Sequence, residues 1–176
     1  MKIWLITDTH FGHDKMEIYC DRPKDFSKRI VKGLEVVEPN DILIHLGDFC
    51  IGNDEVWHRQ FHQEIAGKHW LVKGNHDNKS NSWYLRNGWD WVGAKFQDKF
   101  FGKNILFSHT PQMEDKQIES GLWISGSFDL NIHGHYHNNN HRSKDEQVEI
   151  TKKHKLLAME FTNYQPVLLE NFIKAK

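Results

Sequence analysis

The chain has 176 residues, and its 23 lysines and arginines nearly balance its 24 aspartates and glutamates, leaving a formal net charge of −1. This balance argues against a protein that coats long stretches of nucleic acid, because such binding is mostly phosphate neutralisation. Two cysteines outside any C-x-x-C pair, no room for a signal peptide and no apolar run of about 18 residues indicate a cytoplasmic protein without a membrane-spanning helix. The length suits one domain, and we expect residues 1–176 to form it.

In the first half of the chain, short apolar runs alternate with helical patterns. The runs at 3–6, 42–44 and 70–72 read as strands that end in polar loops. Between them, residues 25–37 and 54–65 carry apolar side chains three or four positions apart, which predicts a helix in each interval. Two strand–helix–strand passages in succession predict parallel strands joined by right-handed crossovers.

The second half has a looser pattern. Residues 91–100 and 103–107 flank Phe101-Gly102, which predicts a hairpin. A further strand is expected at 130–133. Residues 156–161 and 167–170 are expected to pair with each other through a turn. The elements together predict an α/β fold.

Five strand-like runs end in aspartate, asparagine or histidine. These residues are Asp8 and His10, Asp48, Asn75 with His76 and Asp77, His109, and His135 with His137. Functional side chains of open α/β sheets collect in loops at the carboxyl ends of strands, so we expect these residues to meet. A mixture of carboxylate, imidazole and amide suits borderline divalent metal ions and disfavours an all-thiolate zinc site.

In order, the motifs Asp8-x-His10, Gly47-Asp48, Gly74-Asn75-His76-Asp77, His109 and Gly134-His135-x-His137 resemble a known set. The set is D-x-H, G-D, G-N-H-D/E, H and G-H-x-H of the calcineurin-like metallophosphoesterase superfamily. Each motif alone is weak, whereas all five in order are specific. The resemblance covers about residues 2–137. It implies a sandwich of mixed sheets flanked by helices (αββα), here without a cap domain.

The resemblance also implies a pair of metal sites. Asp8, His10 and His137 would hold one divalent ion, and Asn75, His109 and His135 would hold the other, with Asp48 bridging them. Mn²⁺ is the first expectation, with Fe²⁺, Zn²⁺, Co²⁺ or Ni²⁺ as alternatives. Alternate residues of an extended segment face the same way, so D-x-H and H-x-H are each expected to aim two ligands at the site from extended backbone.

Further roles are implied for residues beside the ligands. His76 would be catalytic, stabilising developing charge or protonating the leaving oxygen, and Asp77 would either orient an imidazole or anchor its loop. Asn75 and His76 are expected to contact the substrate, as are His13 and Arg22, which follow the first ligand pair. For Arg22, the sequence favours bidentate phosphate contact and a surface ion pair equally. His45 and His133 lie within strand-like runs, which favours hydrogen-bonded residues of the sheets.

The implied function is hydrolysis of a phosphodiester or phosphomonoester by attack of a metal-bridging hydroxide, on a small or nucleotide-like substrate. A structure-specific nuclease is an alternative, although the net charge does not indicate a nucleic-acid partner. A second alternative is a non-catalytic interaction scaffold on the same fold. Such a scaffold would be expected to lose ligands or the histidine at position 76. No membrane partner is expected.

Overall fold

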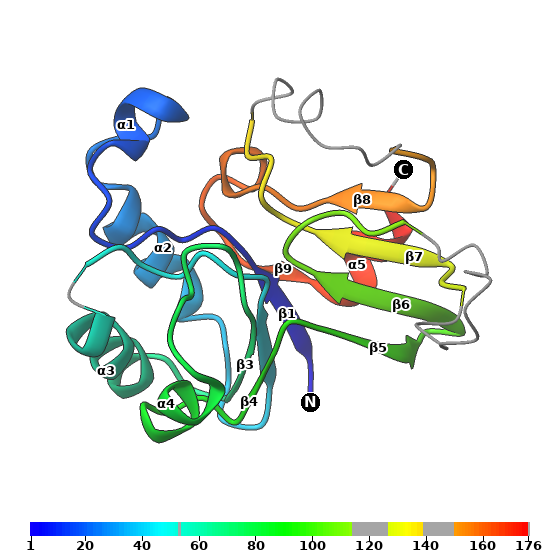
Figure 1. Cartoon of the computed structure of the whole chain (residues 1–176), viewed down its shortest axis with the longest axis horizontal. Coiled ribbons are helices and arrows are strands. Elements are labelled where there is room, and N and C mark those ends of the chain that lie inside the picture. Colours follow the sequence, from blue (N-terminus) through cyan, green and yellow to red (C-terminus); the bar gives the residue numbers. More distant parts are fainter. Residues whose placement is uncertain (53, 114–126, 139–149, 176) are drawn as a thin grey trace.

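The computed structural model describes residues 1–52, 54–113, 127–138 and 150–175. Elements of the first half are β1 (Ile3–Ile6), α1 (Met16–Tyr19), α2 (Phe26–Leu34), β2 (Ile42–His45), α3 (Asp54–Glu64), β3 (Lys68–Val72), α4 (Asn81–Arg86) and β4 (Trp91–Gly93). The second half contains β5 (Lys95–Phe100), β6 (Lys103–Ser108), β7 (Leu130–His133), β8 (His154–Leu156), a 3₁₀ helix (Met159–Phe161), β9 (Val167–Leu168) and α5 (Leu169–Lys174). Within the described residues, the strands form two sheets, ordered β4-β3-β2-β1-β9 and β5-β6-β7-β8 (Figure 1).

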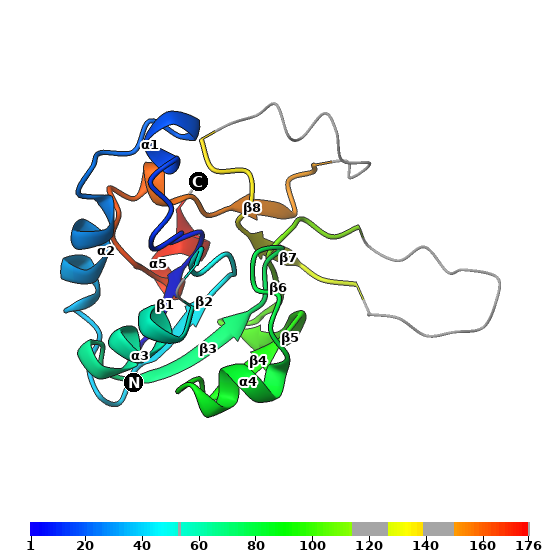
Figure 2. The same ribbon diagram turned by 60° about the vertical axis from the view of Figure 1, so that its left-hand side comes forward.

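The first sheet is built from the predicted strand–helix–strand passages. Its strands β1, β2 and β3 are parallel, with Ile3 opposite Ile42 and Ile42 opposite Lys68. Helices α2 and α3 lie on one side of this sheet (Figure 2), and α2 turns Ile30 and Leu34 into the core beneath them. The parallel pairing is therefore confirmed. None of the helices among the described residues has the length and apolar character needed to cross a membrane.

The other face of the first sheet packs on the second sheet. Leu5 and Ile44 from the first sheet share one buried cluster with Phe107 and Ile132 from the second. The predicted hairpin is present as β5 and β6, which pair antiparallel across Phe101-Gly102. Its first strand is shorter than the expected 91–100, because residues 91–93 form β4 and pair with β3 in the first sheet. The α/β class, with two mixed sheets flanked by helices, is confirmed.

The expected pairing of residues 156–161 with 167–170 is wrong. Strand β8 pairs with β7 in the second sheet, whereas β9 pairs antiparallel with β1 in the first. Between them, residues 159–161 form a 3₁₀ helix, and Met159 is fully buried. Residues 157–159 are buried although β8 ends at Leu156, whereas Phe161 is 69% exposed. The apolar character of 156–161 therefore reflects burial after the strand and predicted a strand that was too long.

Candidate metal centre

The predicted ligand residues lie in loops that leave the carboxyl ends of strands in both sheets. Three of these loops follow β1, β2 and β3, and two follow β6 and β7. Backbone hydrogen bonds join them, since the N–H of Asp8 donates to the carbonyl of Gly47 at 2.9 Å and that of Gly134 donates to the carbonyl of His109 at 2.9 Å. The close meeting of the two sheet edges brings all seven predicted ligands into one region.

The first group of potential metal ligands contains Asp8, His10 and His137. All three side chains are buried, and one donor atom from each lies within 4.8 Å of the others. His137 Nε2 is 3.6 Å and His10 Nε2 is 3.9 Å from Asp8 Oδ1. That oxygen and both ring nitrogens of His10 have no hydrogen-bond partner among the described residues. Buried polar atoms nearly always have a hydrogen-bond partner. These three unpartnered atoms are therefore the kind of site that a bound cation fits.

The second group contains Asp48, His109 and His135, again with donor atoms within 4.8 Å of one another. His109 Nδ1 lies 2.8 Å from the carbonyl oxygen of Leu46 and donates to it. The other ring nitrogen, Nε2, lies 3.1 Å from Asn75 Oδ1 and 3.3 Å from Asp48 Oδ2. A histidine whose far nitrogen is held in this way presents the correct tautomer for metal binding.

Asp48 lies between the two groups. Its Oδ2 atom is 3.3 Å from His109 Nε2 and 3.7 Å from His10 Nε2. Burial acts to raise the pKa of the Asp48 carboxyl, but the hydrogen bond and charge of His109, together with His10, lower it well below its usual value. Burial holds the pKa of His10 well below 6.5, which keeps that imidazole neutral. The donor set of carboxylate oxygens, an amide oxygen and imidazole nitrogens therefore fits two borderline divalent ions.

The backbone at the ligands is left-handed and not extended. Asp8 and His10 both have φ near 47°, and His135 and His137 have φ of 71° and 51°. The expectation that extended segments aim these pairs is therefore wrong. Non-glycine residues in this region cost about 1–3 kcal/mol each and persist where the surroundings over-determine them. The two ligand pairs are therefore aimed at the site by turns and not by continued strands.

Two motif glycines are required by close approach of the loops. A Cβ atom on Gly74 would collide with the carboxylate of Asp48, and one on Gly134 would collide with Thr7 and Asp8. The glycines therefore let the loop after β3 and the loop after β7 press directly against the carboxylates.

Asp77 is placed as a loop anchor. Its Oδ2 atom accepts hydrogen bonds from the backbone N–H groups of Asp48 and Gly74, both at 2.8 Å, and Oδ1 accepts one from Phe49 at 3.2 Å. The carboxyl is buried, and burial raises its pKa. Its two oxygens therefore accept hydrogen bonds that hold the loops after β2 and β3 together.

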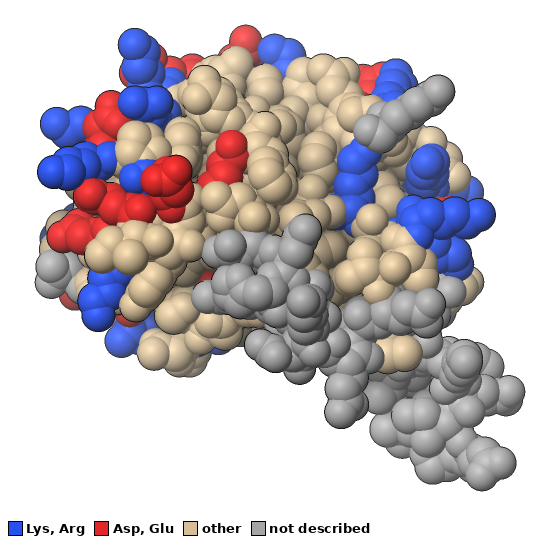
Figure 3. All heavy atoms as spheres, turned by 90° about the horizontal axis from the view of Figure 1, so that it is seen from above, with Lys and Arg blue, Asp and Glu red and all other residues tan. Residues whose placement is uncertain are grey.

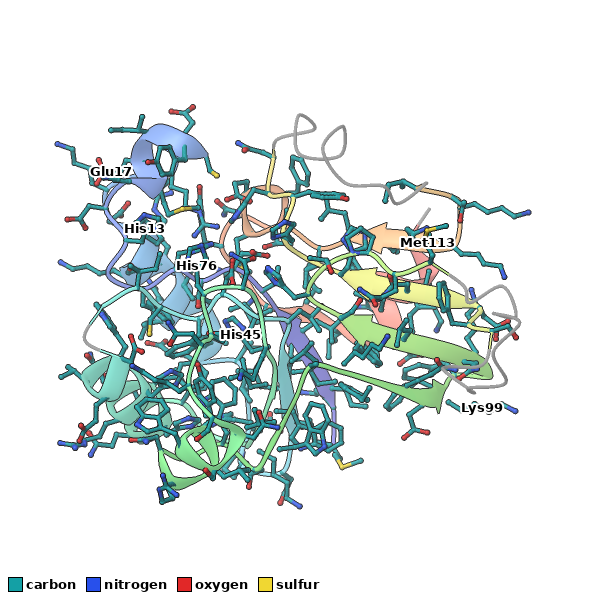
Figure 4. The ribbon with its side chains drawn as sticks, in the orientation of Figure 1. His13, Glu17, His45, His76, Lys99 and Met113 are labelled. Atoms are coloured by element: carbon teal, nitrogen blue, oxygen red, sulfur yellow. The ribbon has the colours of Figure 1, made fainter. Side chains whose placement is uncertain are left out.

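His76 and His13 lie at the open side of the centre (Figure 4). The side chain of His76 is 43% exposed, and its Nε2 atom is 3.9 Å from Asp48 Oδ2. The ring of His13 is 5.5 Å from that of His10 and 6.5 Å from that of His76. Both imidazoles, expected to contact substrate, therefore stand beside the ligand groups.

Arg22 does not stand with them. It is buried and forms an ion pair with Glu160, with Arg22 Nη2 2.7 Å from Glu160 Oε1. It also donates to the carbonyl oxygens of Asp8 and Thr9. Both expectations for Arg22, phosphate contact and a surface ion pair, are corrected, because its donors are used inside the protein. Glu160 was missed by the sequence analysis, since no motif surrounds it.

The two histidines expected within the sheets behave as predicted. His45 Nδ1 accepts from the N–H of Gly47, and its Nε2 lies 2.9 Å from Thr9 Oγ1. His133 Nδ1 donates to the carbonyl oxygen of Gly134. Burial lowers the pKa of His45 to about 3 and that of His133 to about 4, so both are neutral hydrogen-bonded side chains.

Comparison with known proteins places the chain in a family. Residues 1–157 match the family model described as the calcineurin-like phosphoesterase superfamily domain. The chain is 30% identical to the uncharacterized protein MJ1445 of Methanocaldococcus jannaschii, over 98% of this chain and 90% of that protein. The crystal structure of AQ665, a protein of unknown function from Aquifex aeolicus, aligns over 98% of both chains with 28% identity and a TM-score of 0.74.

Proposed function

This chain belongs to the calcineurin-like phosphoesterase superfamily, and on that premise we propose that it hydrolyses a phosphodiester or phosphomonoester with the help of two divalent ions. The proposed substrate is small or nucleotide-like. The observation that carries the proposal is the place of Asp48, whose Oδ2 atom lies 3.3 Å from His109 Nε2 in one ligand group and 3.7 Å from His10 Nε2 in the other. A shared carboxylate is what a two-ion centre requires.

Each of the two ligand groups would bind one ion. Asp8, His10 and His137 would hold one ion, while Asn75, His109 and His135 would hold the other, with Asp48 shared. When bound, such ions supply Lewis acidity towards phosphate oxygens and water. Mn²⁺ is the ion that we propose first.

We assign His76 the role of proton donor to the leaving oxygen. Its ring is 43% exposed, so it is open to a substrate, yet its Nε2 atom remains 3.9 Å from the shared carboxylate. The backbone N–H of the same residue donates to Asp48 Oδ1 at 2.9 Å, which fixes the loop beneath the ring. General acid catalysis of this kind contributes about 10²–10⁴-fold to a rate. His13 would add a hydrogen-bond donor for a phosphate oxygen.

The test is hydrolysis of an aryl phosphodiester beside the matching monoester, on chelator-stripped protein before and after Mn²⁺ is restored. We expect turnover that depends on the metal, and the preferred ester decides between phosphodiesterase and phosphatase. Absence of turnover for both esters and for oligonucleotides, with metal demonstrably bound, would contradict the proposal and favour the scaffold alternative.

The nuclease alternative makes a separate prediction in the same experiment. Cleavage of oligonucleotides that falls steeply with salt would favour it, because phosphate contacts release counterions. On the face shown in Figure 3, lysines and arginines gather at one end and mix with acidic side chains at the other, with uncharged residues between the two groups. Among the described residues visible there, no continuous basic track supports a long nucleic acid.

A further inference from the structure

Glu160 and Arg22 form a buried ion pair behind the first ligand group. Their side chains are 5% and 0% exposed. Glu160 Oε1 lies 2.7 Å from Arg22 Nη2, 2.8 Å from Arg22 Nε and 3.3 Å from His137 Nδ1. Glu160 lies beyond the residues that match the family model, which end at 157. We propose that this pair positions His137 as a metal ligand, an inference that rests on the proposed two-ion function.

Two groups lie beside the Nδ1 atom of His137, each at 3.3 Å: Arg22 Nη2 and Glu160 Oε1. Arginine has no acceptor, so of these two groups only the Glu160 carboxylate can accept a hydrogen from His137. An ion bound at Nε2 would use the lone pair of that nitrogen, so the neutral imidazole would carry its hydrogen on Nδ1. His137 Nδ1 would then donate to Glu160 Oε1.

The consequence falls on the other ring nitrogen. With the hydrogen on Nδ1, the lone pair of His137 Nε2 would be available to the ion, and this atom lies 3.6 Å from Asp8 Oδ1. The carboxylate thus fixes both the orientation and the tautomer of the imidazole. Carboxylate–histidine pairs of this kind support metal ligands in many proteins, and losing the carboxylate typically costs 10–100-fold in metal affinity.

Arg22 extends the same support to the first ligand loop. Besides Glu160 and the carbonyl of Asp8, it donates to the carbonyl of Thr9 at 3.3 Å. These carbonyls lie in the left-handed turn between Asp8 and His10. One guanidinium therefore holds the strained D-x-H turn, while its carboxylate partner holds the H-x-H loop, so the two sources of ligands for one ion are tied together.

A third metal site is the competing explanation for this cluster. Cys20, His137 and Glu160 also place one donor atom each within 4.8 Å of one another. Arg22, however, already occupies Glu160 with two contacts of 2.7 and 2.8 Å, and its positive charge would repel a cation there. Such an ion would also require His137 to give up the Nδ1 proton. The contacts therefore favour positioning over ligation.

The test compares Glu160→Gln with wild type in metal-stripped full-length protein. Gln keeps the size of the side chain and an acceptor oxygen but removes the charge. Calorimetric titration with Mn²⁺ is expected to show two equivalents in wild type, of which one weakens about 10–100-fold in Glu160→Gln while the other is unchanged. The imidazole N–H signals in a ¹H–¹⁵N spectrum give a second readout. We expect one signal to vanish in His137→Asn and to shift in Glu160→Gln.

The neighbouring variant Met159→Leu is the matched control. Met159 is fully buried in the same 3₁₀ helix, so this change perturbs packing without touching the carboxylate. It is expected to leave both equivalents and the imidazole signal unchanged. Should Glu160→Gln fail to fold, Arg22→Lys replaces it. Lysine keeps the charge but lacks the forked donors, so the same single equivalent should weaken.

Three results would overturn the inference while leaving the proposed function standing. The first is a Glu160→Gln variant with both affinities and the imidazole signal intact. The second is equal weakening of both equivalents in Glu160→Gln and Met159→Leu, which would show a general packing role. The third is loss of a third equivalent, which would make Glu160 a ligand. Failure of wild type to bind divalent ions would instead contradict the proposed function itself.

Discussion

Histidines are buried in two quite different regions of this molecule. In the candidate metal centre, imidazoles face carboxylates, as His109 faces Asp48 at 3.3 Å. Helix α3 and the residues packed against it form a second region, which we call the aromatic histidine cluster. It consists of His58, His62 and His69 with Phe49, Phe61 and Trp89. There the imidazoles face rings and one another. His58 stacks on Phe49 at 4.2 Å and accepts a hydrogen bond from Trp89 Nε1.

His109 and His58, one from each region, have pKa values that are shifted in opposite directions. Burial alone acts to lower the pKa in both. At His109 the hydrogen bond to Asp48 and the charges of Asp8 and Asp48 overcome burial and raise the pKa to about 9. At His58 burial prevails and lowers the pKa to about 4. A buried histidine thus becomes a candidate ligand when carboxylates face it, and a neutral packing residue when aromatic rings do.

The change with the largest expected effect is Asp48→Asn. An amide removes the charge that both ligand groups share, so both Mn²⁺ equivalents should weaken by more than the ~100-fold upper range of a residue that only supports a ligand. Ester hydrolysis should be lost at any practical metal concentration. Titration calorimetry measures the affinities, and a variant with full occupancy of both sites would contradict the shared position of Asp48.

His76→Ala should separate catalysis from metal binding. The ring is 43% exposed and belongs to neither ligand group. We expect turnover to fall by about 10²–10⁴-fold, because a proton donor is lost, while metal content measured by elemental analysis stays at the wild-type value. Equal turnover in the variant and wild type would remove the role assigned to this histidine.

Because of its buried neutral His58, the aromatic histidine cluster should make the free energy of unfolding decrease as the pH falls. The folded pKa of His58 lies near 4, below the 6.5 of an unfolded histidine, so the unfolded chain binds the proton first as the pH falls. Its stabilising contribution is complete above pH 6.5 and declines by about 1.4 kcal/mol per pH unit towards pH 4.

Comparison of wild type with His58→Phe isolates the pH-dependent contribution of His58 to the free energy of unfolding. Urea unfolding of chelator-treated protein between pH 7 and 5 should give a shallower loss of stability in the variant, because phenylalanine does not titrate. The contributions of the metal centre are common to both proteins and cancel in the difference. Identical pH slopes would show that His58 is not held neutral by burial.

The smallest effect is expected for a histidine of the aromatic histidine cluster, and it tests directly whether that cluster differs from the metal centre. His62→Phe should leave the Mn²⁺ stoichiometry and hydrolysis unchanged, since His62 contacts His69 and Trp89 and none of the ligand groups. His109→Phe is its counterpart and should lose one equivalent. Elemental analysis of the two proteins is sufficient. Loss of metal from the His62 variant would place a further metal site in the aromatic histidine cluster.

The residues at the strand ends could be identified from the sequence because each follows a strand-like run, and parallel strands bring such ends to one edge. The resemblance in motif order implied which seven of them would be ligands. The parallel pairing of β1, β2 and β3 followed from the same pattern. His45 and His133 were also assigned correctly, since position inside an apolar run indicates burial. In each case the prediction depends only on neighbouring residues, because a polar residue within or just after an apolar run has its place fixed by that run.

Other features depended on contacts between distant segments. Asp77 and Arg22 carry charges that suit either catalysis or anchoring, and only their burial against backbone donors and carbonyls assigns them to anchoring. Glu160 meets Arg22 across 138 positions of the chain. Nothing near Glu160 in the sequence marks it, because the partner that makes its burial tolerable is remote.

The sequence by itself thus determined the fold class, the order of the strand ends and the identity of the residues gathered there, because periodicity and motif order are local properties of the chain. Tertiary structure alone decided the left-handed backbone at the ligands, the separation of β8 and β9 into different sheets and the burial of the Arg22–Glu160 pair. Each of these is stabilised by contacts between segments far apart in the chain, so its energy is not contained in any short stretch of residues.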